Sequence, residues 1–379
     1  GFITPSVPFA ERRFIFMKVL IDDGLRIQLG TGIGNYCLYL YKSLKNRGYN
    51  VELSDYKATS KNRKLKRLQY MRYINSSQFR RKIEGYDIVH FAGQFLPMKK
   101  VKGVKYVVTV HDLTSFIHPE TMSFFTALTS RLKIKRIMKN ADAIVTVSNS
   151  VKKEMTEYFP RYSQKVTPIY PGNYDNIKKI DNIDQFDNEN LKNVENNPFF
   201  LFVGTIEKRK NVGLIIDSFI KLKEKTKEAH NYKLVLAGRP GFGYEEFFKV
   251  AQESKFSQDI IFTGYTSNDD CSRLYCRAAA YIFPTVYEGF GSTQLECMYC
   301  HTPIILSDIP TNREISKNYG LFFSLESIDS LVEQMMVIVN GKYDYEKHNR
   351  LADEYLKNFD WDDIADEYVK LYEEIENKK

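Results

Sequence analysis

The stretch with the most specific chemical pattern in this 379-residue chain holds two carboxylates separated by glycines. It follows the apolar run 280–283 and reads Glu288-Gly289-Phe290-Gly291-Ser292-Thr293-Gln294-Leu295-Glu296. The glycines let the backbone turn sharply and approach a ligand closely. Ser292 or Thr293 then begins a helix, and a helix N-terminus attracts phosphate. Each carboxylate can accept several hydroxyl hydrogen bonds, so the stretch predicts a site for phosphate and sugar groups; an acidic loop before a capped helix is the simpler alternative.

Two adjacent cations, Arg209 and Lys210, form a second candidate element. They lie in the stretch Phe202-Val203-Gly204-Thr205-Ile206-Glu207-Lys208-Arg209-Lys210-Asn211, again between an apolar run and a helical one. Cations beside a pyrophosphate would stabilise the charge that grows on a leaving group. A basic surface turn is the alternative.

A histidine at a predicted strand end is the third candidate. The run Val107-Val108-Thr109-Val110 leads into His111 and Asp112. A side chain at the carboxyl end of a parallel strand points into the ligand crevice, although a lone histidine is more often structural. Ser148 follows another such run, and we expect it to cap a helix beside the crevice. The loop at 30–34 carries glycines, including Gly32, but not at the spacing of a dinucleotide fingerprint.

Short β-branched or aromatic runs alternate with amphipathic stretches along the whole chain. The predicted strands are 18–21, 87–91, 105–109, 143–147, 199–203, 233–237, 260–262, 280–283 and 303–306. The predicted helices include 34–47, 124–140, 212–225, 327–340 and 361–377. This alternation predicts βαβ units and parallel sheets buried on both faces.

The alternation is interrupted once, at 175–198, where Asn, Asp and Lys replace apolar residues. We therefore expect two similar doubly wound α/β domains, 17–175 and 199–360, joined by a linker, 176–198. The last segment, 361–379, has apolar residues at helical spacing and is expected to pack back on the first domain. Residues 1–16 lack a continuous apolar region and are interpreted as a leader or a vector-derived remnant, with a native extension as the alternative.

The formal charge of +8 is concentrated in two basic blocks. Residues 56–83 contain no acid but ten basic residues, and 131–139 hold five more. Such blocks are typical of a solvated helix face, or of attraction to anionic lipid or a polyanionic acceptor. Nucleic acid is not an expected partner, because no recognition motif accompanies the charge.

Five cysteines, an odd number, indicate free thiols in a reducing cytoplasm. No apolar run approaches the roughly 20 residues needed to span a bilayer. We therefore expect a cytoplasmic protein that could lie peripherally on the inner face of the membrane.

The motifs together resemble the retaining glycosyltransferases of the GT-B fold, specifically family 4. Members of that family carry E-G-F-G-x-x-x-L-E, followed by T-P-V-h and S-D, where h is hydrophobic. Here the carboxylates are Glu288 and Glu296, followed by Thr302-Pro303-Ile304-Ile305 and Ser307-Asp308. The stretch at 203–211 is similar to the family pattern V-G-T-h-x-x-R-K-N. The resemblance covers almost the whole chain from Met17 and is more specific in its second half.

The resemblance implies two Rossmann-like domains that face each other across a deep cleft, and a role for each motif. Arg209 and Lys210 take the diphosphate, and His111 contacts the donor sugar near the reacting carbon. Glu288 binds the sugar hydroxyls, Glu296 binds the ribose and the Tyr265 backbone contacts the nucleobase. The donor-binding residues are Gly32, Thr205, Tyr265, Gly289, Phe290, Gly291, Ser292, Thr293 and Glu296. Asp112 and Ser148 are assigned to the acceptor side.

Two positions depart from the commoner family pattern. Thr205 stands where an arginine usually follows the glycine, so Arg209 would have to supply the guanidinium. Thr31 replaces the first of two glycines in the loop that reaches over the phosphates, and Gly32 matches the second.

By resemblance, the activity is retaining transfer of a hexosyl unit to a saccharide or lipid-linked saccharide, giving an α-glycoside. The expected donor is GDP-mannose, because the T-I-E-x-R-K-N and S-D-I-P forms are similar to those of mannosyltransferases. No D-x-D motif follows a strand, so neither a metal nor another cofactor is expected. The alternatives are a nucleotide-sugar epimerase of the same architecture and a non-catalytic carbohydrate-binding relic.

Overall fold

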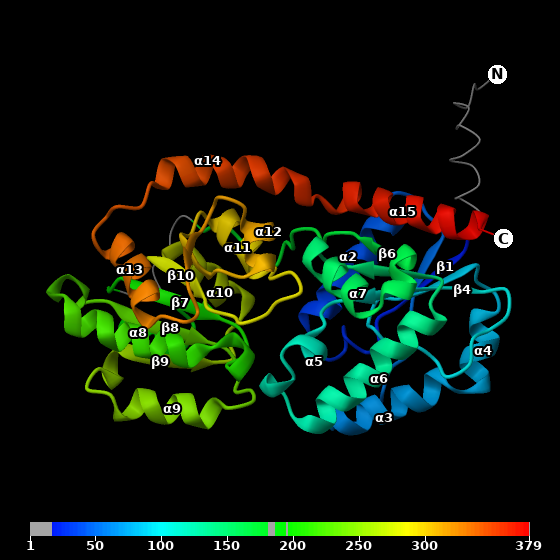
Figure 1. The fold of residues 1–379 in the computed structure, drawn as a ribbon, viewed down its shortest axis with the longest axis horizontal. Coiled ribbons are helices and arrows are strands. Elements are labelled where there is room, and N and C mark those ends of the chain that lie inside the picture. The colour runs from blue at the N-terminus through cyan, green and yellow to red at the C-terminus, as the bar shows by residue number, and fades with distance from the viewer. Residues whose placement is uncertain (1–16, 181–185, 195, 379) are drawn as a thin grey trace, which may run out of the picture. The chain divides into compact units, whose positions relative to one another are not determined.

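The computed structural model of the chain describes residues 17–180, 186–194 and 196–378 (Figure 1). The expected leader, 1–16, and part of the expected linker, 181–185 and 195, lie outside the described residues. The chain forms two compact units. The first comprises the described residues up to Leu113, then Leu128–Gly172 and the residues from Phe359; the second comprises Thr114–Ala127 and Asn173–Asn358. Residues 114–127, which the sequence placed in the first domain, therefore group with the second.

The first unit is built on a parallel sheet with the strand order β2-β1-β3-β4-β5-β6. The four inner strands match the predicted runs and are almost entirely buried, as expected for a parallel sheet with helices on both faces. The two edge strands have three residues each and were not predicted. The bounds are β1 (Val19–Asp22), β2 (Val51–Leu53), β3 (Ile88–Phe91), β4 (Lys105–Val110), β5 (Ala143–Thr146) and β6 (Val166–Pro168).

The helices of the first unit include the last helix of the chain. They are α2 (Gly32–Asn46), α3 (Arg63–Ile74), α4 (Ser77–Ile83), α6 (Phe124–Asn140), whose first turn belongs to the other unit, α7 (Asn149–Tyr158) and α15 (Trp361–Asn377). Helix α15 packs against α2, where Ser43 Oγ donates to the Trp361 carbonyl at 2.9 Å and Arg47 pairs with Asp366 at 2.6 Å. The first unit is thus completed by residues that follow the whole second unit in the sequence.

The second unit has a parallel sheet of its own, in the order β12-β11-β10-β7-β8-β9. All five predicted strands of this half are present, and the edge strand β12 was not predicted. The bounds are β7 (Phe199–Val203), β8 (Lys233–Ala237), β9 (Ile260–Gly264), β10 (Ala280–Phe283), β11 (Ile304–Ser307) and β12 (Leu321–Phe323).

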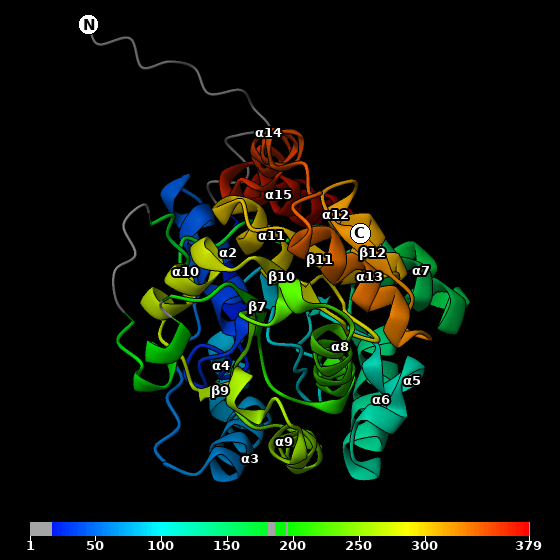
Figure 2. The same ribbon diagram turned by 90° about the vertical axis from the view of Figure 1, so that its left-hand side faces the viewer.

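Helices cover both faces of the second sheet. Helices α8, α9 and α13 pack on one face through a fully buried apolar core, and α10 and α11 lie on the other (Figure 2). The bounds are α5 (Thr114–Ile117), α8 (Val212–Lys225), α9 (Tyr244–Glu253), α10 (Asn268–Arg277), α11 (Thr293–Cys300), α12 (Pro310–Ser316), α13 (Ile328–Val339) and α14 (Tyr345–Tyr355). Two doubly wound α/β units, each with its own sheet, confirm the predicted fold class. No helix in the described part of the chain is both long and apolar enough to cross a bilayer.

Candidate active site

The loop between β10 and α11 carries the paired carboxylates of the sequence motif. Gly291 adopts a φ of +80°, and a Cβ there would lie 2.5 Å from Gln294 Nε2 and 3.1 Å from the Phe283 ring. Only glycine fits this turn without strain. Helix α11 begins at Thr293 as predicted, although the Ser292 side chain makes no capping hydrogen bond.

Polar side chains at the end of β11 and just after it support this loop. Thr311 Oγ1 donates to the Glu288 carbonyl at 2.8 Å, and Ser307 Oγ donates to the Thr285 carbonyl at 2.6 Å. Asn312 Nδ2 donates to the Ser307 carbonyl at 2.9 Å, and its Oδ1 accepts from Gln294 Nε2 at 3.1 Å. Sequence reasoning noted Ser307 only as part of a family pattern and did not identify Thr311 or Asn312 as supports. Their position just after a predicted strand could have indicated that they lie near the site.

The structure brings Glu288 into contact with both Arg209 and Lys210. Arg209 Nη1 lies 2.6 Å from Glu288 Oε1, and Lys210 Nζ bonds the same oxygen. The three side chains are only 12–22% exposed. Burial alone would raise the pKa of Glu288, but the two cations outweigh it and lower the pKa to about 2. Burial lowers the pKa of Lys210 despite the carboxylate beside it. Sequence reasoning predicted all three residues as site residues but not this contact.

Backbone groups and a second carboxylate fix the arginine further. Arg209 Nη1 donates to the Tyr287 carbonyl at 2.9 Å, and Nη2 lies 3.0 Å from Glu207 Oε1. Thr285 Oγ1 donates to the Arg209 carbonyl at 3.2 Å, which ties the two loops together. Sequence reasoning did not single out Thr285 or Glu207.

Glu296 lies one turn into α11 and is separate from this ion-paired group. Its Oε2 accepts a hydrogen bond from Tyr275 at 2.9 Å, and burial raises its pKa. Thr205 is exposed on the loop after β7. Tyr265, after β9, is 67% exposed, and the Arg239 guanidinium stands 4.6 Å from its ring centroid. Sequence reasoning did not identify Arg239 or Tyr275.

The predicted His111 directly follows β4, at the carboxyl end of that strand. His111 Nε2 lies 2.8 Å from the Ala92 carbonyl, so Nε2 carries the proton and Nδ1 is left as an acceptor. Burial lowers the pKa of His111 to about 4, which leaves the ring neutral at pH 7. The Tyr36 ring meets it edge-on, with centroids 5.0 Å apart.

The remaining predicted residues of this unit occupy loops and helix ends. Gly32 is the first residue of α2, which Thr31 caps by accepting from Gly34 N at 3.1 Å. Asp112 is exposed next to His111. Ser148 is buried and caps α7 by accepting from Val151 N at 3.1 Å, as the sequence predicted for a helix cap.

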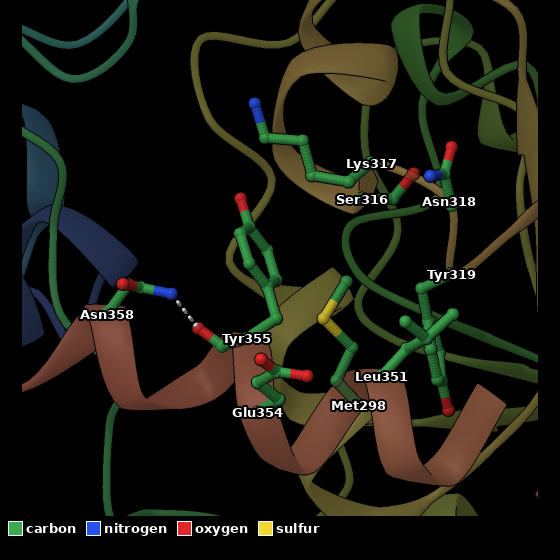
Figure 3. A pocket seen from close by; sticks show the side chains of 9 residues that line it. All are labelled: Met298, Ser316, Lys317, Asn318, Tyr319, Leu351, Glu354, Tyr355 and Asn358. Carbon is green, nitrogen blue, oxygen red and sulfur yellow. Dashed lines mark hydrogen bonds between the residues drawn. The ribbon is translucent and has the colours of Figure 1, made fainter. Parts of the chain in front are cut away.

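Two further features of the described residues bear on ligands. No group of three His, Cys, Asp or Glu side chains in the described ranges is arranged to hold a metal ion. A separate cavity of about 260 Å³ in the second unit is lined from α11, α12 and α14 (Figure 3). The lining includes Met298, Lys317 and Tyr355 but none of the predicted donor-binding residues.

Comparison with known proteins covers both halves of the chain. The sequence model of the family "Glycosyl transferases group 1" matches residues 183–357, and that of "Glycosyltransferase Family 4" matches residues 30–173. The O-antigen chain mannosyltransferase RfbU of Salmonella typhimurium is 26% identical over 261 residues, which cover 66% of this chain and 68% of the relative. The O-antigen chain mannosyltransferase B of Escherichia coli is 23% identical, covering 90% and 96%.

Solved structures show the same fold at low sequence identity. Sucrose-phosphate synthase from Thermosynechococcus elongatus superposes with a TM-score of 0.70 at 16% identity, covering 95% of this chain and 99% of that one. WaaG, a glycosyltransferase involved in lipopolysaccharide biosynthesis, superposes with a TM-score of 0.66 at 16% identity, covering 93% and 99%.

Proposed function

The chain belongs to the family 4 glycosyltransferases and has their GT-B fold, and from this premise we propose that it transfers a mannosyl unit from a nucleotide sugar to a saccharide acceptor. The observation that supports the proposal most is the contact of Glu288 with Arg209 and Lys210. It joins the sugar-binding and phosphate-binding motifs at one end of one sheet. The two mannosyltransferase relatives favour mannose, and GDP-mannose is the donor we propose.

Each residue of the group has a proposed task in donor binding. Within the described residues, every hydrogen bond to the Glu288 side chain ends on Oε1, so we assign Oε2 to a sugar hydroxyl. Arg209 and Lys210 would bind the diphosphate, where negative charge grows as the glycosidic bond breaks. Glu296 would accept from the ribose hydroxyls and Tyr265 would meet the base.

Retention of configuration needs a proton acceptor on the face from which the donor phosphate leaves. We propose that the departing phosphate oxygen takes the proton of the acceptor hydroxyl as the new bond forms on the same face. Neutral His111, which accepts through Nδ1, would orient a donor hydroxyl near the reacting carbon rather than supply a charge.

A panel of nucleotide sugars tests the donor assignment. GDP-mannose should raise the melting temperature of the protein and be slowly hydrolysed without acceptor, and the transferred sugar should be α-linked by NMR. A shift with UDP-sugars only would contradict mannose from GDP-mannose, and a β-linked product would contradict retention. Conversion of donor alone to an epimeric nucleotide sugar would support the epimerase, which the mannosyltransferase relatives do not favour.

We also propose that the leaving diphosphate is neutralised without a metal. Turnover should then persist after treatment with EDTA, measured on metal-stripped protein and donor. Loss of turnover that Mn²⁺ restores would mean that a metal carries the leaving-group charge instead.

A further inference from the structure

The first unit contains a cluster of cations to which the proposed donor site gives no task. Arg26 follows β1 and Lys133 lies on α6, and both stand over the ring of Phe95, which follows β3. Lys133 Nζ is 4.8 Å and Arg26 Cζ is 5.5 Å from the ring centroid. Arg26 Nε also donates to the Gly93 carbonyl at 3.4 Å. Among the described residues, neither cation forms an ion pair with a carboxylate.

The charges around the cluster do not balance. Burial and the charge of Arg26 lower the pKa of Lys133 to about 8, while Asp112 opposes them. Burial also lowers the pKa of Arg26, with a further contribution from Arg67 on α3. Arg26, Lys133 and Arg67 therefore face two carboxylates, those of Asp112 and Asp23, which leaves an excess of positive charge. Partly desolvated like charges destabilise one another, so an anion among them would be favourable.

The position of the cluster in the fold is that of a ligand site. Strand β1 has β2 on one side and β3 on the other, so the loops after β1 and β3 leave the sheet in opposite directions. In doubly wound folds ligands bind in the crevice at such a switch point. Arg26 and Phe95 come from these two loops. The charges of Arg26 and Lys133 also act on His111, after β4, which places the cluster beside that residue.

We propose that Arg26 and Lys133 bind a phosphate or diphosphate ester carried by the acceptor, so that the acceptor is a saccharide phosphate or a saccharide linked to a lipid through diphosphate. The planar guanidinium suits two phosphate oxygens and the ammonium a third. The inference rests on the proposed transferase function, in which Arg209 and Lys210 of the other unit already serve the donor diphosphate.

Acceptor kinetics test the proposal with three forms of one sugar: a sugar phosphate, a prenyl diphosphate conjugate and an uncharged alkyl glycoside. Lys133→Gln and Arg26→Gln should each raise the KM of the phosphorylated acceptors about tenfold, as expected for loss of a charged hydrogen bond. The KM of the alkyl glycoside and of the donor should not change. Lys153→Gln, an exposed lysine on α7, is the matched control. Whichever phosphorylated acceptor, the sugar phosphate or the prenyl diphosphate conjugate, has the lower KM is the closer match to the natural acceptor.

Equal effects on charged and uncharged acceptors would overturn the proposal, as would a rise in donor KM, which would assign the cluster to the donor. Hydrolysis of the donor in the absence of acceptor tests the proposed transferase function separately from the proposed acceptor site. A second measurement does not depend on turnover: inorganic pyrophosphate should slow amine-reactive labelling of Lys133, and Arg26→Gln should remove that protection. Labelling of Lys133 that pyrophosphate leaves unchanged would also overturn it.

Discussion

Glu288, Arg209 and Lys210 stabilise one another's charges, because each side chain is largely withdrawn from water. A buried carboxylate without the two cations would gain a proton, and the cations without it would repel each other. Removing one partner should therefore disturb both the local structure and the electrostatics of the proposed diphosphate site.

Kinetics should separate residues that act on the transition state from those that only bind the donor. Arg209→Ala and Lys210→Ala should lower kcat by roughly 10²–10³-fold, as for loss of a preorganised electrostatic donor. Glu296→Gln should mainly raise the donor KM, because the ribose does not change during the reaction. Lys208→Ala, an exposed neighbour in the same 3-10 helix (Lys208–Lys210), is the control.

The opposite pattern would relocate the chemistry. If Glu296→Gln abolished kcat with the donor KM intact, while both cation variants were silent, the reaction would be organised around that carboxylate. The diphosphate would then not lie on the loop that carries Arg209.

Asp22 should make the first unit less stable as pH rises. Burial, and secondly the charge of Asp23, raise the pKa of Asp22 from 3.8 to about 6. Its stabilising contribution is full below pH 3.8, where both states are protonated, and is lost as the pH rises through 6. The loss amounts to about 3 kcal/mol. Asp22→Asn removes this titration, so the stability of the variant relative to the wild type should increase between pH 4 and pH 6.5 in urea denaturation. A stability difference between Asp22→Asn and the wild type that does not vary with pH would contradict a raised pKa for Asp22.

At the scale of elements, α15 is tied to the first sheet by a buried polar network. Tyr372 Oη lies 2.7 Å from His90 Nδ1, and His90 Nε2 lies 2.8 Å from Thr109 Oγ1. Tyr36 Oη, on α2, contacts the same Thr109 hydroxyl at 2.9 Å and also bonds Tyr368. Apolar packing alone would permit α15 to slide along α2, whereas these bonds specify one register.

Tyr372→Phe should therefore destabilise the first unit by about 1–3 kcal/mol, because it leaves a buried ring nitrogen of His90 without its partner. The measurement is urea denaturation followed by far-UV circular dichroism. Tyr345→Phe, with a tyrosine 47% exposed on α14, is the control and should be neutral. An equally neutral Tyr372→Phe would show that the network adds nothing to packing.

The elements also show what the sequence could predict. Inner strands such as β7 and β10 are continuous apolar runs because both of their faces are buried, and these runs located the strands correctly in the sequence. Of the four edge strands, β2, β6 and β12 have three residues each, which is too short to carry a pattern, whereas the five-residue β9 was predicted. The motifs predicted both Arg209 and Glu288, but their contact depends on β7 lying next to β10, and strand order across 79 residues is a tertiary property.

At the scale of the whole molecule, the two sheets repeat one arrangement. In each, the first strand lies between the second and a later strand, as β1 lies between β2 and β3 and β7 between β8 and β10. The ion-paired group of Glu288 follows β7 and β10, and the cluster of Arg26 and Lys133 adjoins β1 and β3. Each unit thus presents charged side chains at its own switch point, one set for each proposed substrate.

The basic block at 56–83 includes helix α3, and we predict that the exposed surface of this helix binds anionic membranes. Helix α3 exposes Leu65 by 53% and Leu68 by 48% among basic residues. Tyr70, on the same helix, is buried and donates to Asp22, so it adds no apolar contact to this surface. Electrostatic attraction should then dominate, at about 1 kcal/mol at most for each basic residue near the surface.

Vesicle sedimentation measures this directly. Binding to vesicles with anionic lipid should exceed binding to neutral vesicles and should fall steeply as salt is raised, because screening shortens the reach of the charges. Lys64→Glu combined with Lys66→Glu should weaken it strongly, whereas Lys347→Glu, exposed on α14 in the other unit, should not. Equal binding to both kinds of vesicle would leave α3 as a solvated surface. A lipid-linked acceptor would then have to reach the cluster of Arg26 and Lys133 without help from this helix.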